Sequence, residues 1–77
     1  MATHGYFLGV RPNGSAIRAI RAAQHLSLRT LASQTDRDRG HLSRLERGQA
    51  GASEETIRRI AQALGVPLSA ITHEETT

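Results

Sequence analysis

The 77-residue sequence contains no cysteine and no lysine, and only 3% of its residues are aromatic. Without cysteine the chain has no disulfide, no thiolate nucleophile and none of the commonest zinc sites, which is compatible with a reducing compartment. The longest uninterrupted apolar run is Tyr6-Phe7-Leu8, which is too short for a transmembrane helix or the core of a signal peptide. We therefore expect a cytoplasmic protein that binds no membrane.

The basic residues are all arginines, ten of them against seven acids, and they are unevenly distributed. Residues 11–47 hold eight arginines and three acids, a net charge of +5, whereas residues 48–77 hold two arginines and four acids, a net charge of −2. A basic half of a chain is typical of a surface that meets a polyanion. A solvated arginine-rich surface is an equally good interpretation of the charge alone.

The short length allows one domain with a simple core. Residues 1–14 are rich in glycine and end in Arg11-Pro12-Asn13-Gly14, a turn sequence that blocks a helix. They are predicted to form an N-terminal arm, either flexible or strand-like. At the other end, residues 73–77 have nothing apolar to bury, which predicts a disordered tail.

Between arm and tail, four residues that favour helix starts precede periodic apolar stretches; they are Ser15, Ser27, Asp38 and Ser53. The predicted helices lie at 16–24, 28–34, 39–47 and 54–64. Residues 68–71 can add one more helical turn. The predicted fold is therefore an all-α, five-helix domain over residues 15–72. Its expected core is Ile17, Ile20, Leu31, Leu42, Leu45, Ile57, Ile60, Leu64, Val66 and Ile71.

The segments 28–34 and 39–47 are separated only by residues 35–38, a spacing that suits a helix-turn-helix whose second helix projects outward. On that second helix Leu42 and Leu45 mark the buried side. The opposite side is basic and carries little side-chain bulk near its start; it holds Arg39, Gly40, Ser43, Arg44 and Arg47.

Over Ile17–Ile71 the sequence resembles the phage-repressor and Cro-like (XRE) family of helix-turn-helix regulators. The matching pieces are Ile17-Arg18 and Arg21, Leu31-Ala32, Leu42-Ser43-Arg44-Leu45-Glu46-Arg47-Gly48, and Ile60-Ala61-Gln62-Ala63-Leu64-Gly65-Val66. Their order and spacing together make the match specific. The resemblance implies a repressor-like transcriptional regulator, of a kind found on mobile elements. Such a protein would bind double-stranded DNA as a homodimer and read the major groove with residues 39–47.

The resemblance further implies base contacts from the start of that helix and one turn later, which here means Arg39, Gly40, Ser43 and Arg44. Arg39 and Arg44 are the leading candidates because arginine pairs bidentately with guanine in the major groove. Contact with phosphate or with solvent is the alternative interpretation for both. Phosphate contacts are expected from Arg29, Arg37, His41, Arg47 and Ser53.

Two further roles follow from the resemblance. Arg21 and Glu46 occupy positions that often form a buried ion pair in this family, which would link the first helix to helix 39–47 and orient it. The arm could pack on its own core, pair as a strand with a partner subunit, or place Arg11 in a minor groove. Packing is the interpretation that we favour.

The sequence departs from the family pattern at three points. Leu28 stands where glutamine commonly touches phosphate, so Arg29 is expected to replace that contact. Asp36 and Arg37 stand where glycine and an apolar residue are usual; Asp36 can adopt the left-handed conformation, and Arg37 would then join the DNA-facing charge. Gly40 replaces a long base reader, so recognition is expected to rely more on DNA shape and on Arg39, Arg44 and His41.

Nothing in the sequence predicts an enzyme, since it has no recognisable nucleophile arrangement, no paired catalytic carboxylates and no glycine-rich phosphate loop. His4, His25, His41 and His73 have no ligand spacing, so we expect no metal, no cofactor and no small-molecule substrate. A protein-interaction module, such as an antitoxin or an adaptor with the same fold, remains the alternative function.

Overall fold

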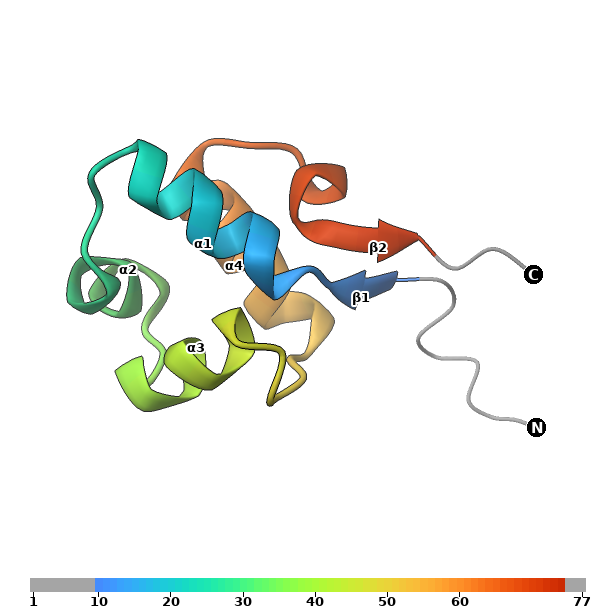
Figure 1. Cartoon of the computed structure of the whole chain (residues 1–77), viewed down its shortest axis with the longest axis horizontal. Coiled ribbons are helices and arrows are strands. Elements are labelled where there is room, and N and C mark those ends of the chain that lie inside the picture. Colours follow the sequence, from blue (N-terminus) through green and yellow to red (C-terminus); the bar gives the residue numbers. More distant parts are fainter. Residues whose placement is uncertain (1–9, 75–77) are drawn as a thin grey trace.

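The computed structural model describes residues 10–74 as a strand, four α-helices, a short 3₁₀ helix and a second strand (Figure 1). The elements are β1 Val10–Pro12, α1 Gly14–Ala23, α2 Leu28–Thr35, α3 Arg39–Glu46, α4 Glu54–Leu64, η2 Leu68–Ile71 and β2 Thr72–Glu74. The predictions for residues 1–9 of the arm and 75–77 of the tail lie outside the described residues. No helix in the described part is long and apolar enough to cross a membrane.

Three of the α-helices begin at the predicted caps. Ser27, Asp38 and Ser53 each accept a hydrogen bond from the backbone N–H three residues later, at 3.0, 2.9 and 3.1 Å. These bonds satisfy donors that have no partner inside the helix. The starts of α2, α3 and α4 are therefore as the sequence predicted.

The start of α1 differs from the prediction, because Asn13 and not Ser15 is its cap. Asn13 Oδ1 accepts hydrogen bonds from Ala16 N at 3.1 Å and from Ser15 Oγ at 3.0 Å. Asparagine is at least as good an N-cap as serine. The helix therefore begins after Asn13, the earlier of the two residues. As a result α1 begins at Gly14, two residues before the predicted start.

Buried aliphatic side chains from all the helices form one core. Eight of the ten predicted core residues are buried, while Ile20 and Val66 are partly exposed and pack against the rest. The buried apolar set is Ile17, Leu31, Ala32, Leu42, Leu45, Ile57, Ile60, Ala61, Leu64 and Ile71. Thr35 is also fully buried, and its Oγ1 donates to Leu31 O at 2.8 Å. Because this bond satisfies the hydroxyl group, a polar residue can be buried in the last turn of α2.

The two ends of the described chain pair as an antiparallel two-stranded sheet, so the all-α prediction is wrong at this point (Figure 1). The register joins Val10 to Glu74, Arg11 to His73 and Pro12 to Thr72. The strand-like option for the arm is confirmed for residues 10–12, whereas 73 and 74 belong to β2 and not to a tail. Strands of three residues are too short for an apolar alternation to show in the sequence.

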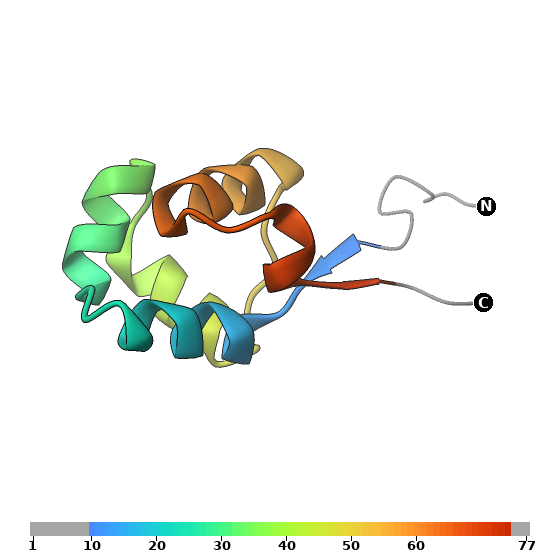
Figure 2. The ribbon, with the colours of Figure 1, turned by 90° about the horizontal axis from the view of Figure 1, so that it is seen from above.

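The fifth predicted helix is the 3₁₀ helix η2, so the helix count was too high by one α-helix. Only four residues separate Pro67 from Thr72, too few to nucleate an α-helix. Ile71 is buried beneath this turn, which closes the end of the core between α1 and α4 (Figure 2).

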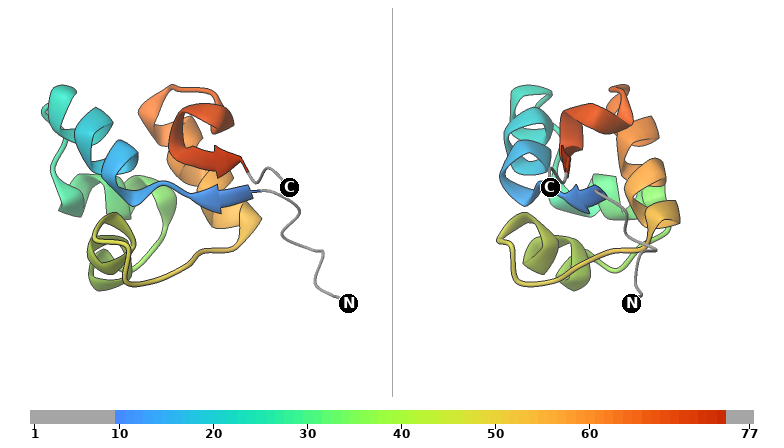
Figure 3. Two further views of the ribbon diagram at one scale, coloured as in Figure 1. Left: turned by 45° about the vertical axis from the view of Figure 1, so that its right-hand side comes forward. Right: turned by 90° about the vertical axis from the view of Figure 1, so that its right-hand side faces the viewer.

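The helices surround the core in an arrangement that places α3 at one side. In the right-hand view of Figure 3, α1 and α4 stand opposite each other, η2 bridges them, and α3 lies below α1. The sheet and both ends of the described chain lie at one end of the molecule, and the turn between α2 and α3 lies toward the other (Figure 1). Among the elements of residues 10–74, none covers one long side of α3.

Candidate nucleic-acid interface

The turn between α2 and α3 depends on a left-handed residue. Asp36 has φ 56° and ψ 45°, which confirms that it can take the conformation that glycine usually supplies. Arg37 N then donates to Ala32 O at 3.0 Å, closing the end of α2. The chain leaves this turn extended at Asp38, where α3 begins.

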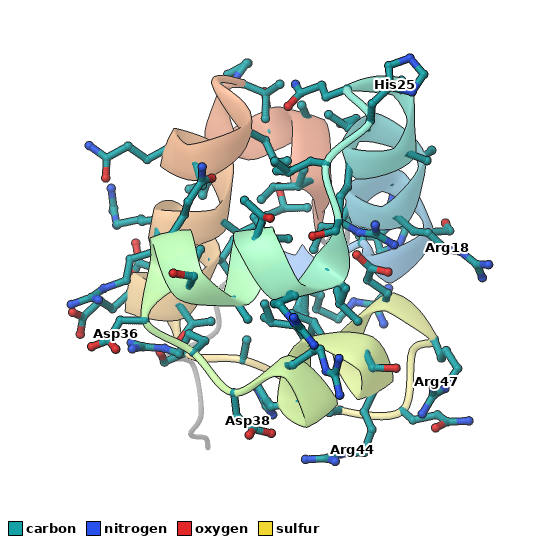
Figure 4. All side chains as sticks on the ribbon, turned by 90° about the vertical axis from the view of Figure 1, so that its left-hand side faces the viewer. Arg18, His25, Asp36, Asp38, Arg44 and Arg47 are labelled. Carbon is teal, nitrogen blue, oxygen red and sulfur yellow. The ribbon has the colours of Figure 1, made fainter. Side chains whose placement is uncertain are left out.

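The buried side of α3 is narrow. Leu42 and Leu45 are each 1% exposed, and Glu46 is also buried. The opposite side faces outward: Arg39, Gly40, Arg44 and Arg47 are exposed, and His41 and Ser43 are half-buried. Figure 4, viewed from the α2 side, shows Arg44 extending from α3 away from the helix cluster. The four residues predicted to read bases therefore lie on, or at the edge of, the uncovered side.

The first turn of α3 carries little bulk. Gly40 is exposed, and a Cβ added there would come within 3.0 Å of Asp38 Oδ2, the same atom that caps His41 N at 2.9 Å. A larger residue would therefore press on the capping carboxylate. With glycine present, this turn lacks side-chain bulk of its own, and the other atom near the position of such a Cβ is Arg44 Nη1, at 3.6 Å.

Ser43 and Arg47 are joined to each other. Arg47 Nη1 donates to Ser43 Oγ at 2.5 Å, and Arg47 Nε donates to Gln49 Oε1 at 3.3 Å. The guanidinium is thus folded back along α3, although the Ser43 hydroxyl proton stays available as a donor. Because Ser43 and Arg47 are hydrogen-bonded to each other, a substitution at one of these predicted DNA contacts also affects the other.

Arg37 and Ser53 both take part in a network at the start of α4. Arg37 Nε donates to Thr56 Oγ1 at 2.8 Å, and Ser53 Oγ donates to the same oxygen at 3.0 Å. Arg37 Nη1 also donates to Asp36 O at 3.0 Å. The sequence did not reveal this link, which ties the helix-turn-helix to α4. Arg37 and Ser53 thus have a structural role, whatever else they contact.

Arg29 and Arg11, the two outlying predicted contacts, lie far apart. Arg29 is exposed in the first turn of α2, and this helix packs against α3. Arg11 is exposed in β1, opposite His73 in the register, at the end of the molecule that carries both chain ends. Arg29 therefore belongs to the helix-turn-helix itself, whereas Arg11 lies on the two-stranded sheet.

The ion pair expected between Arg21 and Glu46 is present and has two hydrogen bonds. Arg21 Nε lies 2.7 Å from Glu46 Oε2, and Nη2 lies 3.0 Å from Oε1. Arg21 Nη1 donates to Leu26 O at 2.8 Å. The bonds to Glu46 raise the pKa of Arg21, against the opposing effect of burial. With side chains 16% and 5% exposed, this pair fastens the last turn of α3 to α1.

Four exposed arginines make no hydrogen bond or ion pair with any residue in the range 10–74; they are Arg18, Arg29, Arg39 and Arg44. Arg18 was not among the predicted contacts. In Figure 4 it extends from α1 toward the same edge as Arg47. Its signal in the sequence was its neighbour Ile17, whose burial turns the next residue outward on a helix.

The described histidines do not gather, and Figure 4 places His25 at the opposite end of the molecule from α3. Among residues 10–74 no group of three or more His, Asp or Glu side chains could hold a metal ion.

Comparison with known proteins gives consistent results. The family model HTH_3, described as helix-turn-helix, matches residues 17–71. The immunity repressor protein of Bacillus phage phi105 is 38% identical over 63 residues, which cover 82% of this chain and 44% of the repressor. The chain thus spans less than half the length of this curated relative.

Solved structures share the fold closely. The restriction-modification controller protein C.AhdI from Aeromonas hydrophila has 35% identity and a TM-score of 0.72, over 74% of this chain and 86% of that one. The clp gene regulator ClgR from Corynebacterium glutamicum has 38% identity and a TM-score of 0.71, over 73% and 60%. The biofilm regulator SinR, solved in complex with DNA, has 26% identity and a TM-score of 0.68, over 73% and 90%.

Proposed function

The chain belongs to the HTH_3 family of helix-turn-helix proteins, and from this premise we propose that it is a transcriptional regulator that binds specific sequences in double-stranded DNA. The observation that carries the proposal is the uncovered side of α3. Its arginines Arg39 and Arg44 have no partner in the described residues, and Gly40 lets its first turn approach closely. A basic helix of this kind fits the major groove, which is wide enough to admit an α-helix.

Arg39 and Arg44 are the proposed base readers, and Gly40 and Ser43 the sites where bases pass close to the helix. Arginine offers two parallel donors to guanine O6 and N7, a geometry that lysine cannot match. Ser43 is restrained by Arg47, which supports a contact made by its hydroxyl proton.

The proposed phosphate contacts surround this helix. Arg29 has no partner in residues 10–74, so its charge is available to a phosphate. Arg37 and Ser53 meet at Thr56 at the start of α4, where backbone N–H groups attract an anion, although Glu54 and Glu55 in the same turn weaken that attraction. His41 and Arg47 complete the set, and Arg11 remains a separate candidate for the minor groove.

Likeness to a phage immunity repressor supports repression as the form of regulation and a mobile element as the origin of the chain. A homodimer on a pseudo-palindromic operator fits both, with half-sites about 34 Å apart so that two α3 helices enter successive turns of one groove.

Selection of operators from a random duplex library, followed by titration at several salt concentrations, tests the proposal. We expect one enriched pseudo-palindromic sequence, and affinity that falls steeply with salt because arginines displace counterions from phosphates. Failure to enrich any sequence, together with stable capture of a partner protein by the same preparation, would instead support the antitoxin or adaptor alternative.

A further inference from the structure

The first turn of α1 lies directly against the last turn of α3, and a glycine makes the contact possible. An ideal Cβ at Gly14 would overlap the carbonyl oxygen of Leu45 and lie 2.8 Å from Glu46 O and 2.9 Å from Glu46 C. All three are backbone atoms, so no change of rotamer can make room. Gly14 does not have a positive φ. Close approach alone therefore requires glycine at this position.

We propose that Gly14 is a positioning residue for the DNA-reading helix: it sets how closely α3 is held to α1, and hence how far Arg39 and Arg44 project. This inference rests on the proposed function of α3. Gly14 is too far inside to touch DNA itself, since it is buried between the two helices. Its effect is exerted entirely through the backbone of Leu45 and Glu46.

Of the two helices, α3 is the one that would yield to an added Cβ. The start of α1 is fixed from several sides: Asn13 N donates to Ile71 O at 2.9 Å, Asn13 caps the helix, and Ile17 is 1% exposed in the core. By contrast, α3 is only eight residues long and its first turn is exposed. A push on its last turn would therefore be carried to Arg39 at the far end.

The ion pair of Arg21 with Glu46 lies at the same end of α3. It fixes the helix along α1, because both nitrogens of the fork meet one carboxylate. Gly14 touches the neighbouring backbone of Glu46, so it limits the distance between the helices while the ion pair limits sliding and rotation. Together the two contacts define the position of the last turn of a short helix whose first residues, Arg39 and Gly40, are exposed.

Gly51 offers a matched control for substitution by alanine. A Cβ there meets no atom within 4 Å, and its φ is not positive. Gly51→Ala therefore changes the same chemical group without a clash. Asn13→Ala is a second control, since loss of a cap lowers stability without placing an atom between α1 and α3.

The experiment compares Gly14→Ala with both controls at a temperature where circular dichroism shows each protein to be folded. The readout is the ratio of affinity for the selected operator to affinity for an unrelated duplex. For Gly14→Ala we expect this ratio to fall at least about tenfold, as after loss of one good base contact. Both controls should keep the ratio of the unsubstituted protein, although Asn13→Ala melts earlier. An unchanged ratio for Gly14→Ala would overturn the proposal, as would an equal fall for Asn13→Ala.

If Gly14→Ala is unfolded in the absence of DNA, the readout is the recovery of the helical circular dichroism signal when each duplex is added. Binding of DNA stabilises the folded state. We expect operator and unrelated duplex to restore helix about equally. Preferential recovery with operator, by the ratio seen for the unsubstituted protein, would refute the positioning role.

A measurement without DNA separates this proposal from the proposed function. Backbone amide shifts of Gly14→Ala should change throughout residues 39–46, including the exposed first turn of α3. Changes confined to the first turn of α1 would contradict the proposal even if DNA binding is confirmed. Conversely, if the shifts show that α3 has moved but the unsubstituted protein selects no operator, the contact between Gly14 and α3 is supported and the proposed DNA-binding function is not.

Discussion

The arginines of α4 and those of α3 both lie on helix surfaces, yet only those of α4 have exposed acidic partners. Arg58 Nη2 lies 2.5 Å from Glu54, and Arg59 Nη2 lies 3.0 Å from Glu55. Each pair places the acid one turn before the base, which is the favourable order on a helix. The two acids also lie at the positive end of the helix dipole. The charge of α4 is thus neutralised within the helix.

The surface of α3 is arranged in the opposite way. Its single acid, Glu46, is buried and committed to Arg21, and the carboxylate of Asp38 accepts the capping bond at its start. Neither is left to neutralise Arg39 or Arg44. An unpaired surface arginine costs little in water, and it can displace the counterions that are condensed on a DNA phosphate. The difference teaches that the net charge of a segment matters less than which of its charges are already paired.

The largest effect is expected from removing the two unpaired arginines of α3. Arg39→Ala with Arg44→Ala should weaken operator binding by about 2 to 6 kcal/mol, the sum for two base contacts, which is at least about thirtyfold. Fluorescence anisotropy with operator and unrelated duplex measures it. The matched control is Arg58→Ala with Arg59→Ala, which removes the same charge from α4. Equal losses in the two double variants would show that total charge, and not the surface of α3, governs binding.

The next largest effect is expected on stability. Removing the acid of the buried ion pair should lower the free energy of unfolding much more than removing the acid of an exposed ion pair. Glu46→Ala leaves the guanidinium of Arg21 partly buried without its partner, at a cost of about 3 kcal/mol or roughly 12 °C in melting temperature. Glu54→Ala, at an exposed pair, should cost below about 0.5 kcal/mol. Thermal unfolding followed by circular dichroism measures both.

Replacing both partners at the buried site tests the reason for that loss. Arg21→Met with Glu46→Leu should recover most of the stability, because no buried charge is left unpaired. A double variant as unstable as Glu46→Ala alone would indicate that lost packing, and not an orphaned charge, destabilises the protein.

The sequence predicted those parts of the fold that depend on local chemistry. Three of four caps and eight of ten core residues were visible in residue type and spacing. The left-handed Asp36 and the pairing of Arg21 with Glu46 followed from the resemblance to the family. Each depends on a side chain acting within one turn of helix, or on a family pattern that carries a longer contact. The assignment of DNA contacts to individual residues stays a prediction.

What the sequence could not predict depends on backbone contacts between distant segments. The pairing of β1 with β2 joins residues about sixty positions apart, and neither strand carries an apolar alternation. The close approach at Gly14 involves two carbonyl groups of α3, which no side-chain pattern records. Arg37 could be expected at the surface, but its bond to Thr56 Oγ1 requires knowing where α4 begins in space.

A single exposed arginine of α2, Arg29, should show a smaller, sequence-independent effect. For Arg29→Ala, the slope of log affinity against log salt concentration should become shallower by about 0.9, as expected for one phosphate contact. Affinity should fall by the same factor for operator and unrelated duplex. Arg58→Ala, whose guanidinium already has a partner, should leave the slope unchanged. A loss confined to the operator would make Arg29 a base reader.

The smallest effect is expected from removing the acidic partners of the α4 arginines. This change tests whether DNA binding requires only an unpaired arginine, or an unpaired arginine on the surface of α3. Glu54→Gln with Glu55→Gln removes both acidic partners and two negative charges while keeping the helix surface nearly isosteric. If the location on α3 is required, affinity for any duplex should rise by less than about threefold, because long-range attraction is screened beyond a Debye length. The ratio of affinities for operator and unrelated duplex should not change. If availability of an unpaired guanidinium were enough, α4 would become a second DNA-binding surface, with tenfold tighter binding and a steeper salt dependence. Arg59 argues against that result, because its Nη1 also donates to Thr35 O at 3.2 Å. Even without Glu55, this arginine stays attached to the turn and is not free to follow a phosphate.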